Sequence, residues 1–129
     1  MPRTQLNPWT WQDAFGFSQG WRVDGLGSVL FLSGQAPISA EGKVVGEGDF
    51  EAQVRQVFSN IGAVLEQGGA TFDSIVRLTV YLTDMSNLRD FGRIKGEFIS
   101  GPQPASTAIG VTSLALPGMM VEVEATAVI

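Results

Sequence analysis

The sequence predicts an α+β fold in which two helices cover one face of a single sheet. Two segments repeat apolar side chains at the helical period, and several others alternate or cluster them as strands do. These segments follow one another in the order ββ-α-β-α-ββ. Two helices cannot cover both faces of a sheet of five or six strands, so one face is expected to be open within a single chain.

The N-terminal part of the chain is predicted to form an arm followed by a β-hairpin. Residues 1–15 show no clear period, and we expect them to pack as an irregular arm. Alternation over residues 17–23 and an apolar run over residues 28–33 predict two strands, joined by a turn signal at residues 24–27. The tryptophans are expected to anchor this part in the core, with stacking on a ligand as the alternative: Trp9, Trp11 and Trp21.

Two segments have the apolar periodicity of an amphipathic helix. The first covers residues 49–67, with Asp49 as N-cap and the Gly-Gly pair at residues 68–69 as its stop. The second covers residues 86–99, with Ser86 as N-cap. Two glycines in its interior each cost about 1 kcal/mol relative to alanine. We therefore expect a close approach to another backbone at these positions, Gly92 and Gly96.

Three further strands are predicted over residues 74–83, 106–111 and 119–128. Their alternation places polar side chains among apolar ones on the open face: Thr79, Tyr81, Glu122, Glu124 and Thr126. A mixed face of this kind is expected to meet the sheets of other copies in an oligomer. No linker or repeat interrupts the pattern, so residues 1–129 are predicted to form one domain.

The composition excludes several kinds of chemistry. The chain has 129 residues, a formal net charge of −5, and neither histidine nor cysteine. Without these residues there is no imidazole base, no Ser-His-Asp triad, no disulfide and no metal site built on Cys or His. Any catalysis is expected to use carboxylates, hydroxyls, backbone dipoles or bound water, with no metal.

Charge and hydropathy also limit the expected partners. The lysines are Lys43 and Lys95, and the six arginines are scattered, which argues against nucleic-acid binding. No apolar run reaches the roughly 18 residues of a membrane span. The first residues lack the charged and apolar regions of a signal peptide. We therefore expect a cytoplasmic protein with no nucleic-acid or membrane partner.

Four short strings resemble those of the RidA/YjgF family, also called the Rid or L-PSP family. They are FSQG at residues 17–20, LSGQAP at residues 32–37, VRLTVYLTDM at residues 76–85 and VEVEA at residues 121–125. The resemblance covers about residues 15–128. It implies a chorismate-mutase-like α+β fold and a homotrimer with inward-facing sheets and a small-molecule site at each subunit interface. It also implies hydrolysis of reactive enamines and imines to 2-oxo acids and ammonia, without a cofactor.

Glu122 is the candidate catalytic residue. It lies two residues from Glu124, so both carboxylates project from the same face of a strand. Imine hydrolysis needs a water directed at an electrophilic carbon, and a partly buried carboxylate can act as the general base. The resemblance matches the family's catalytic glutamate to Glu122. The alternative is that both carboxylates are solvated or salt-bridged surface groups.

The resemblance also implies substrate-binding positions. Ser33 and Gly34 match a Ser-Gly-Gln string that lines the family's cleft, where a hydroxyl and an amide N–H can donate hydrogen bonds. The alternative is the end of a strand followed by a turn glycine. Phe17 falls on a cleft tyrosine and lacks its hydroxyl. Gly92 falls where an asparagine is often found.

The arginine that grips the substrate carboxylate in imine-hydrolysing relatives is missing. It belongs to a Pro-Ala-Arg-Ser/Thr string, and its position falls on Ser106, or on Ala105 if the gap is placed differently. Ser106, Thr107 and Ala108 remain the substrate-binding candidates here. Losing a charge-assisted contact of about 1.5–3 kcal/mol favours a larger or uncharged ligand. Three other arginines are candidates to replace the missing one in the cleft, and the alternative is that they are exposed surface charges: Arg77, Arg89 and Arg93.

Three functions are compatible with these features. The first is a Rid-type deaminase that acts on an enamine or imine other than the small amino-acid ones, which the retained Glu122 and Ser33 support. The second is a non-catalytic trimer that binds a small metabolite, which the missing arginine and tyrosine hydroxyl support. The third is the ribonuclease or translation-inhibitor role of some relatives, against which the low basic content argues.

Overall fold

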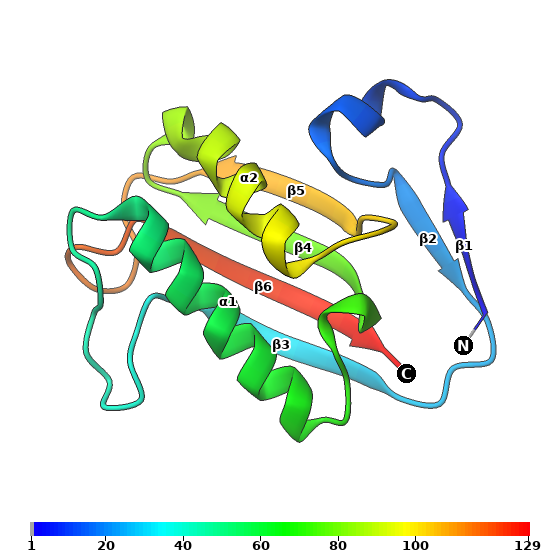
Figure 1. Cartoon of the computed structure of the whole chain (residues 1–129), viewed down its shortest axis with the longest axis horizontal. Coiled ribbons are helices and arrows are strands. Elements are labelled where there is room, and N and C mark those ends of the chain that lie inside the picture. The colour runs from blue at the N-terminus through cyan, green and yellow to red at the C-terminus, as the bar shows by residue number, and fades with distance from the viewer. Residues whose placement is uncertain (1) are drawn as a thin grey trace.

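Four strands form the main sheet in the order β3-β6-β4-β5, and both α-helices lie on one of its faces (Figure 1). The computed structural model describes residues 2–129. The strands are β3 (Val29–Gln35), β4 (Ile75–Leu82), β5 (Ala105–Gly110) and β6 (Val121–Val128). Neighbours are antiparallel except β4 and β5, which are parallel and need a crossover, supplied by α2 (Leu88–Phe98). The predicted α+β class, with two helices on one face, is confirmed.

The helices begin and end close to the predicted residues. α1 spans Phe50–Gln67, and the carboxylate of Asp49 accepts a hydrogen bond from the backbone N–H three residues on, at 3.1 Å, which confirms this N-cap. The prediction that Ser86 caps the second helix is wrong. A 3-10 turn, η3 (Met85–Asn87), precedes α2. Its N-cap is Asp84, whose side chain accepts hydrogen bonds from the amide and hydroxyl of Ser86. Among the described residues, no helix is long and apolar enough to span a membrane.

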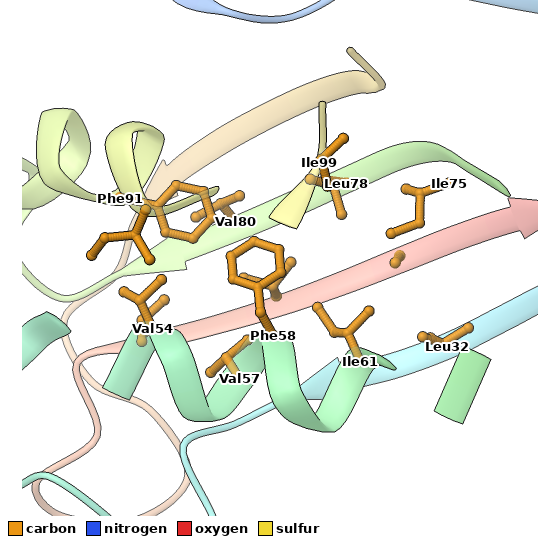
Figure 2. Close-up of a cluster of buried hydrophobic side chains, with 14 of the residues drawn as sticks. Leu32, Val54, Val57, Phe58, Ile61, Ile75, Leu78, Val80, Phe91 and Ile99 are labelled. Atoms are coloured by element: carbon orange, nitrogen blue, oxygen red, sulfur yellow. The ribbon is translucent and has the colours of Figure 1, made fainter. Parts of the chain in front are cut away.

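The hydrophobic core lies between the helices and the sheet (Figure 2). Phe58 of α1 is fully buried and stacks on Phe98 of α2, with ring centroids 5.0 Å apart. Alternate side chains of β4 and β6 point into the same space because successive residues of a strand face opposite sides. This cluster fixes both helices on one face and includes Leu32, Val54, Val57, Ile61, Leu78, Val80, Phe91 and Val123.

The predicted hairpin between the first two strands is wrong. β2 (Gly20–Val23) pairs with β1 (Arg3–Leu6) in a separate two-stranded sheet, so the segment expected to be an irregular arm contains a strand. A 3-10 helix, η1 (Trp11–Phe15), lies between these two strands in the chain. Figure 1 shows the small sheet standing beside the main one.

The chain enters β2 beside one edge of the main sheet and enters β3 at the opposite edge. Ser18, just before β2, forms a parallel bridge with Ala105 at the start of β5. Ser28, just before β3, instead exchanges two backbone hydrogen bonds with Ile129, after the end of β6. These long-range pairings separate the two segments that the sequence predicted to be hairpin partners.

The tryptophans of the N-terminal segment differ in burial. Trp9 and Trp11 are 56% and 53% exposed, so the prediction that they anchor the arm in the core is wrong. Trp21 is half-buried, with the Arg3 guanidinium carbon 4.6 Å from its ring centroid. Its indole N–H donates to the Gln103 carbonyl at 3.0 Å, which ties the small sheet to the loop before β5.

The uncovered face of the main sheet is mixed, as predicted. On β6 the small apolar residues are buried beneath the helices, whereas Glu122 and Glu124 between them point to the open face and are half-buried. Phe31 of β3 is 82% exposed and Ile109 of β5 is 39% exposed. Large apolar side chains that are exposed on the open face of a sheet are typical of surfaces that contact another protein.

Candidate functional site

The predicted site residues lie in two groups on opposite faces of the main sheet. Glu122 of β6 lies opposite Tyr81 of β4 on the open face. On β5, Ser106 and Ala108 are paired with buried residues of β4 and face the helices. Thr107 lies between them and faces the open side. The sequence therefore identified residues from two distinct places within one chain.

Glu122 lies beside an irregular stretch of β3. The register between β3 and β6 shifts between Leu32 and Gln35, and Ser33 and Gly34 fall within this shift. A Cβ built at Gly34 would lie 2.7 Å from Glu122 Oε2, a distance that real Cβ contacts do not show. Only glycine therefore lets the carboxylate lie against this backbone, and the structure brings the three predicted residues of this group together.

Tyr81 is a polar neighbour of Glu122 that the sequence did not identify as a site residue. Its hydroxyl donates to Glu124 Oε1 at 3.0 Å. That hydrogen bond, followed by burial and the charges of both carboxylates, raises the pKa of Tyr81 above its ordinary value. The phenol therefore stays protonated at neutral pH, with its proton shared in the hydrogen bond to Glu124. Strand alternation predicts that the side chains of Tyr81, Glu122 and Glu124 share one face. Which of them lie opposite one another on neighbouring strands is known only from the structure.

A cavity of about 830 Å³ lies between η1, α2 and β5. Phe17, Ser106 and Ala108 all line it, so the structure brings together the second group of predicted binding residues. Trp11 contacts Phe17 edge-on, with ring centroids 5.8 Å apart. Trp11 also contacts Phe15 edge-on at 6.2 Å, and the three rings form an aromatic wall. The volume falls within the range of about 300–1,000 Å³ that is typical of small-molecule sites.

The two glycines of α2 also line this cavity. A Cβ at Gly92 or at Gly96 would meet no other atom within 4 Å. The prediction of a close backbone approach at these glycines is therefore wrong within the described chain. Their missing side chains instead widen the cavity on its helical side.

Lys95 is a buried cation at this cavity that sequence reasoning missed. Its side chain is nearly enclosed, with the residue 7% exposed, and its Nζ donates to the Gly16 carbonyl at 2.8 Å. Burial lowers the pKa of Lys95 below its ordinary value. Within residues 2–129, no carboxylate lies within 4.0 Å of this ammonium. The spacing of residues on α2 could have indicated this burial. Lys95 follows Phe91 by four residues and precedes Phe98 by three, so it lies on the same face of the helix as these apolar residues.

The three arginines considered as substitutes lie in different places. Arg89 lines the cavity. Arg77 lies on the open face, with its guanidinium 3.4 Å from Thr107 Oγ1. Arg93 forms an ion pair with Glu51 of α1 at 3.2 Å, on the outer surface of the helices. Across the described part of the chain, no three His, Cys, Asp or Glu side chains gather closely enough to hold a metal ion.

Comparison with known proteins gives a consistent result. The sequence model of the family described as Endoribonuclease L-PSP matches residues 12–129. A RutC family protein of Pyrococcus abyssi is 33% identical over 111 residues, which cover 86% of this chain and 84% of that protein. The crystal structure of YyfB from Yersinia pestis, titled as a protein of unknown function of the conserved Rid protein family, superposes with a TM-score of 0.90. It is 36% identical and covers all of both chains.

A further solved structure has the same fold. RidA from the Antarctic bacterium Psychrobacter sp. superposes with a TM-score of 0.74, at 32% identity, covering 88% of each chain. The match of the family model over most of the chain, the identities above 30% and these superpositions agree with one another. The chain belongs to the Endoribonuclease L-PSP family, which is the Rid or RidA/YjgF family that its sequence resembles.

Proposed function

We propose that this protein is a Rid-type deaminase, which hydrolyses a reactive enamine or imine to a carbonyl compound and ammonia. The observation that carries the proposal is the position of Glu122, half-buried on the open face and packed against Gly34. The irregular stretch of β3 that contains Ser33 and Gly34 lies beside this carboxylate. Such a group can bind and orient a water without a metal or an organic cofactor.

The chemistry requires one base and one proton donor. Glu122 removes a proton from water as the oxygen attacks the imine carbon, and the C=N double bond becomes a C–N single bond. The protonated Glu122 returns this proton to nitrogen, and the carboxylate then carries the proton of the new hydroxyl to nitrogen, so that the C–N bond breaks and gives the carbonyl and ammonia. The Tyr81 hydroxyl, on the strand next to Glu122, keeps its proton and holds the neighbouring carboxylate of Glu124 by a hydrogen bond.

The complete site is proposed to form between copies of the chain. Within one chain, Glu122 and the cavity that contains Ser106 lie on opposite faces of the main sheet, so one molecule cannot present both groups to the same small ligand. The exposed Phe31 and Ile109 make the open face suitable for contact with another copy. A homotrimer with a ligand site at each interface, which the family resemblance implies, would join the two groups.

The substrate is proposed to be larger or more apolar than the imines of small amino acids. Ser106 provides only a hydroxyl where relatives that hydrolyse such imines have an arginine, and Phe17 provides no hydroxyl at all. Both residues line a cavity with Trp11, Phe15 and Phe91, whose rings favour an apolar group.

Competition with semicarbazide tests the proposed activity. An amino-acid oxidase generates an imine, semicarbazide traps it, and the protein is added. Hydrolysis by the protein slows the formation of semicarbazone. We expect a stronger effect with imines of phenylalanine or leucine than with that of alanine. No effect with any of a panel of amino acids would contradict the proposed activity and support the second candidate, a metabolite-binding trimer without catalysis.

Ser106→Arg is expected to raise activity on the alanine-derived imine by roughly ten- to a hundredfold, because a charge-assisted hydrogen bond contributes about 1.5–3 kcal/mol. The rate is measured by the semicarbazide competition, and trimer content by light scattering. Ser100→Arg, at an exposed position outside the cavity, is the matched control and should change nothing. A correctly assembled Ser106→Arg variant with no gain would contradict the assignment of Ser106 to the carboxylate position.

Ribonuclease activity is not part of the proposal. The basic residues number eight against 13 acidic ones and do not form a continuous patch along the sequence, whereas phosphate-backbone binding needs clustered positive charge. RNA that remains intact during incubation with a nuclease-free preparation of the protein is the expected result.

A further inference from the structure

The cavity under α2 contains a positive group that forms no ion pair with any residue of the described range 2–129. Lys95 is more than nine-tenths buried, and its one recorded hydrogen bond goes to a neutral carbonyl, that of Gly16. A buried ammonium loses its hydration, and a neutral acceptor only partly replaces it. An anionic ligand in the cavity would supply the missing interaction.

A second polar group at the cavity also lacks a partner. Gln103 Oε1 is buried and accepts no hydrogen bond from residues 2–129. The orientation of this amide is fixed, because its Nε2 donates to the carbonyls of Ile99 and Gly101 at 3.0 and 3.1 Å. Rotating the amide would place its oxygen against two carbonyl oxygens. A ligand with an N–H or O–H group could therefore donate to Gln103 Oε1.

The charges around the cavity favour a negative ligand. Besides Lys95, its lining contains Arg89 on α2 and Asp13 on η1. Arg89 forms no ion pair in the described structure, and β4 and β5 contribute only uncharged residues to the lining. The cavity thus carries a local excess of positive charge, although the chain as a whole has a net charge of −5. Its other walls are mainly aromatic and apolar.

We propose that this cavity binds a carboxylate that carries an aromatic or similarly bulky apolar group, with Lys95 Nζ holding the carboxylate. The apolar group lies against the wall formed by Trp11, Phe15 and Phe17, and a donor on the ligand reaches Gln103 Oε1. Lys95, on a different element from Ser106, thereby supplies the positive charge that Ser106 does not. Identifying this ligand as the substrate rests on the proposed deaminase function, but the binding itself does not.

Calorimetry with 3-phenylpropanoate and its uncharged methyl ester tests the inference. We expect the intact protein to bind the acid roughly ten- to a hundredfold more tightly than the ester, as for a charge-assisted hydrogen bond. Lys95→Met keeps the length and apolar stem of the side chain and should remove this preference while leaving ester affinity unchanged. Lys43→Met, on an exposed loop, is the matched control and should behave like the unmodified protein.

Three outcomes would overturn the inference. If Lys95→Met keeps the preference for the acid, or if the unmodified protein binds neither probe at millimolar concentration, the cavity does not use Lys95 to hold a carboxylate. If the variant loses affinity for both probes equally, Lys95 acts only by holding η1 against α2 through Gly16.

The pH dependence of binding provides a readout that a purely structural role would not change. Burial holds the pKa of Lys95 in the free protein below its ordinary value, so Lys95 loses its proton at a lower pH than an exposed lysine does. Affinity for 3-phenylpropanoate should therefore decrease as the pH rises through that pKa, whereas affinity for the ester should stay constant. The other charged groups that line the cavity are Asp13 and Arg89.

The binding experiment and the deaminase assay test different statements, so either can fail without the other. Lys95-dependent binding of the acid in a protein that hydrolyses no imine would leave this inference intact and contradict the proposed function. Imine hydrolysis with the same preference for bulky substrates in Lys95→Met would support the function and contradict the inference.

Discussion

Glu122→Gln is expected to lower the rate of imine hydrolysis by a factor of roughly 10²–10⁴, which is the usual contribution of a general base. Glutamine has almost the same shape as glutamate, so it keeps the packing against Gly34 and removes only the ability to take a proton from water. The measurement is the rate of imine loss in the semicarbazide competition, with the assembly state checked by light scattering.

Glu124→Gln is the matched comparison, because it changes a second carboxylate on the same face of the same strand. Glu124 accepts a hydrogen bond from Tyr81, and the glutamine oxygen can still accept it, so we expect less than a tenfold loss. Equal losses of activity in the two variants would indicate that both carboxylates act through their negative charge, and that neither is the single general base. Full activity in Glu122→Gln would contradict the proposed mechanism.

Phe58→Ala is expected to destabilise the fold by about 3–5 kcal/mol, the usual cost of removing a buried phenylalanine. Phe58 is fully buried at the centre of the core (Figure 2). Its ring stacks on Phe98, and its centroid lies 5.8 Å from that of Phe91. Small domains typically have a total stability of about 5–15 kcal/mol, so this variant would be marginal. Urea unfolding followed by circular dichroism measures the change.

Val64→Ala is the control on the same helix, because Val64 is 40% exposed and fills no core space. We expect a change of about 0.5 kcal/mol or less. A small effect of Phe58→Ala, similar to that of Val64→Ala, would mean that the aromatic cluster is not the main link between α1 and α2.

Regular periodicity predicted much of the main sheet and both helices. α1 was expected at residues 49–67 and lies at Phe50–Gln67, and β4 was expected at residues 74–83 and lies at Ile75–Leu82. These elements follow a local rule, because one buried face requires apolar side chains at the period of the element. The start of α2 was less accurate, because an Asp84 turn precedes it and competes with the expected Ser86 cap.

Strand pairing at the N-terminus was not predictable in the same way. Residues 17–23 and 28–33 are close in sequence and joined by a turn signal, which favours a hairpin. Their partners are instead supplied by distant residues, Ala105 for one segment and Ile129 for the other. Which edge of a sheet a strand joins depends on all the strands together, and a short sequence window does not contain that information.

The candidate site, too, was predictable from the sequence only in part. Resemblance to the family drew attention to Glu122, Gly34 and Ser106, but it could not show that the first two and the third lie on opposite faces of one chain. Lys95 was passed over because lysine is usually exposed, and its burial depends on η1, which is about 80 residues earlier in the chain.

Residue types and their spacing were enough to predict both α-helices and the strands of the main sheet, the absence of histidine and cysteine chemistry, and the family. Those properties depend on residue types and on short-range spacing, which are complete in the sequence. The pairing of the N-terminal strands, the place of the cavity and the presence there of a lysine that pairs with no carboxylate of residues 2–129 became known from the folded structure alone. Burial and strand partners are properties of residues that meet across long stretches of chain, so they exist only once the chain has folded.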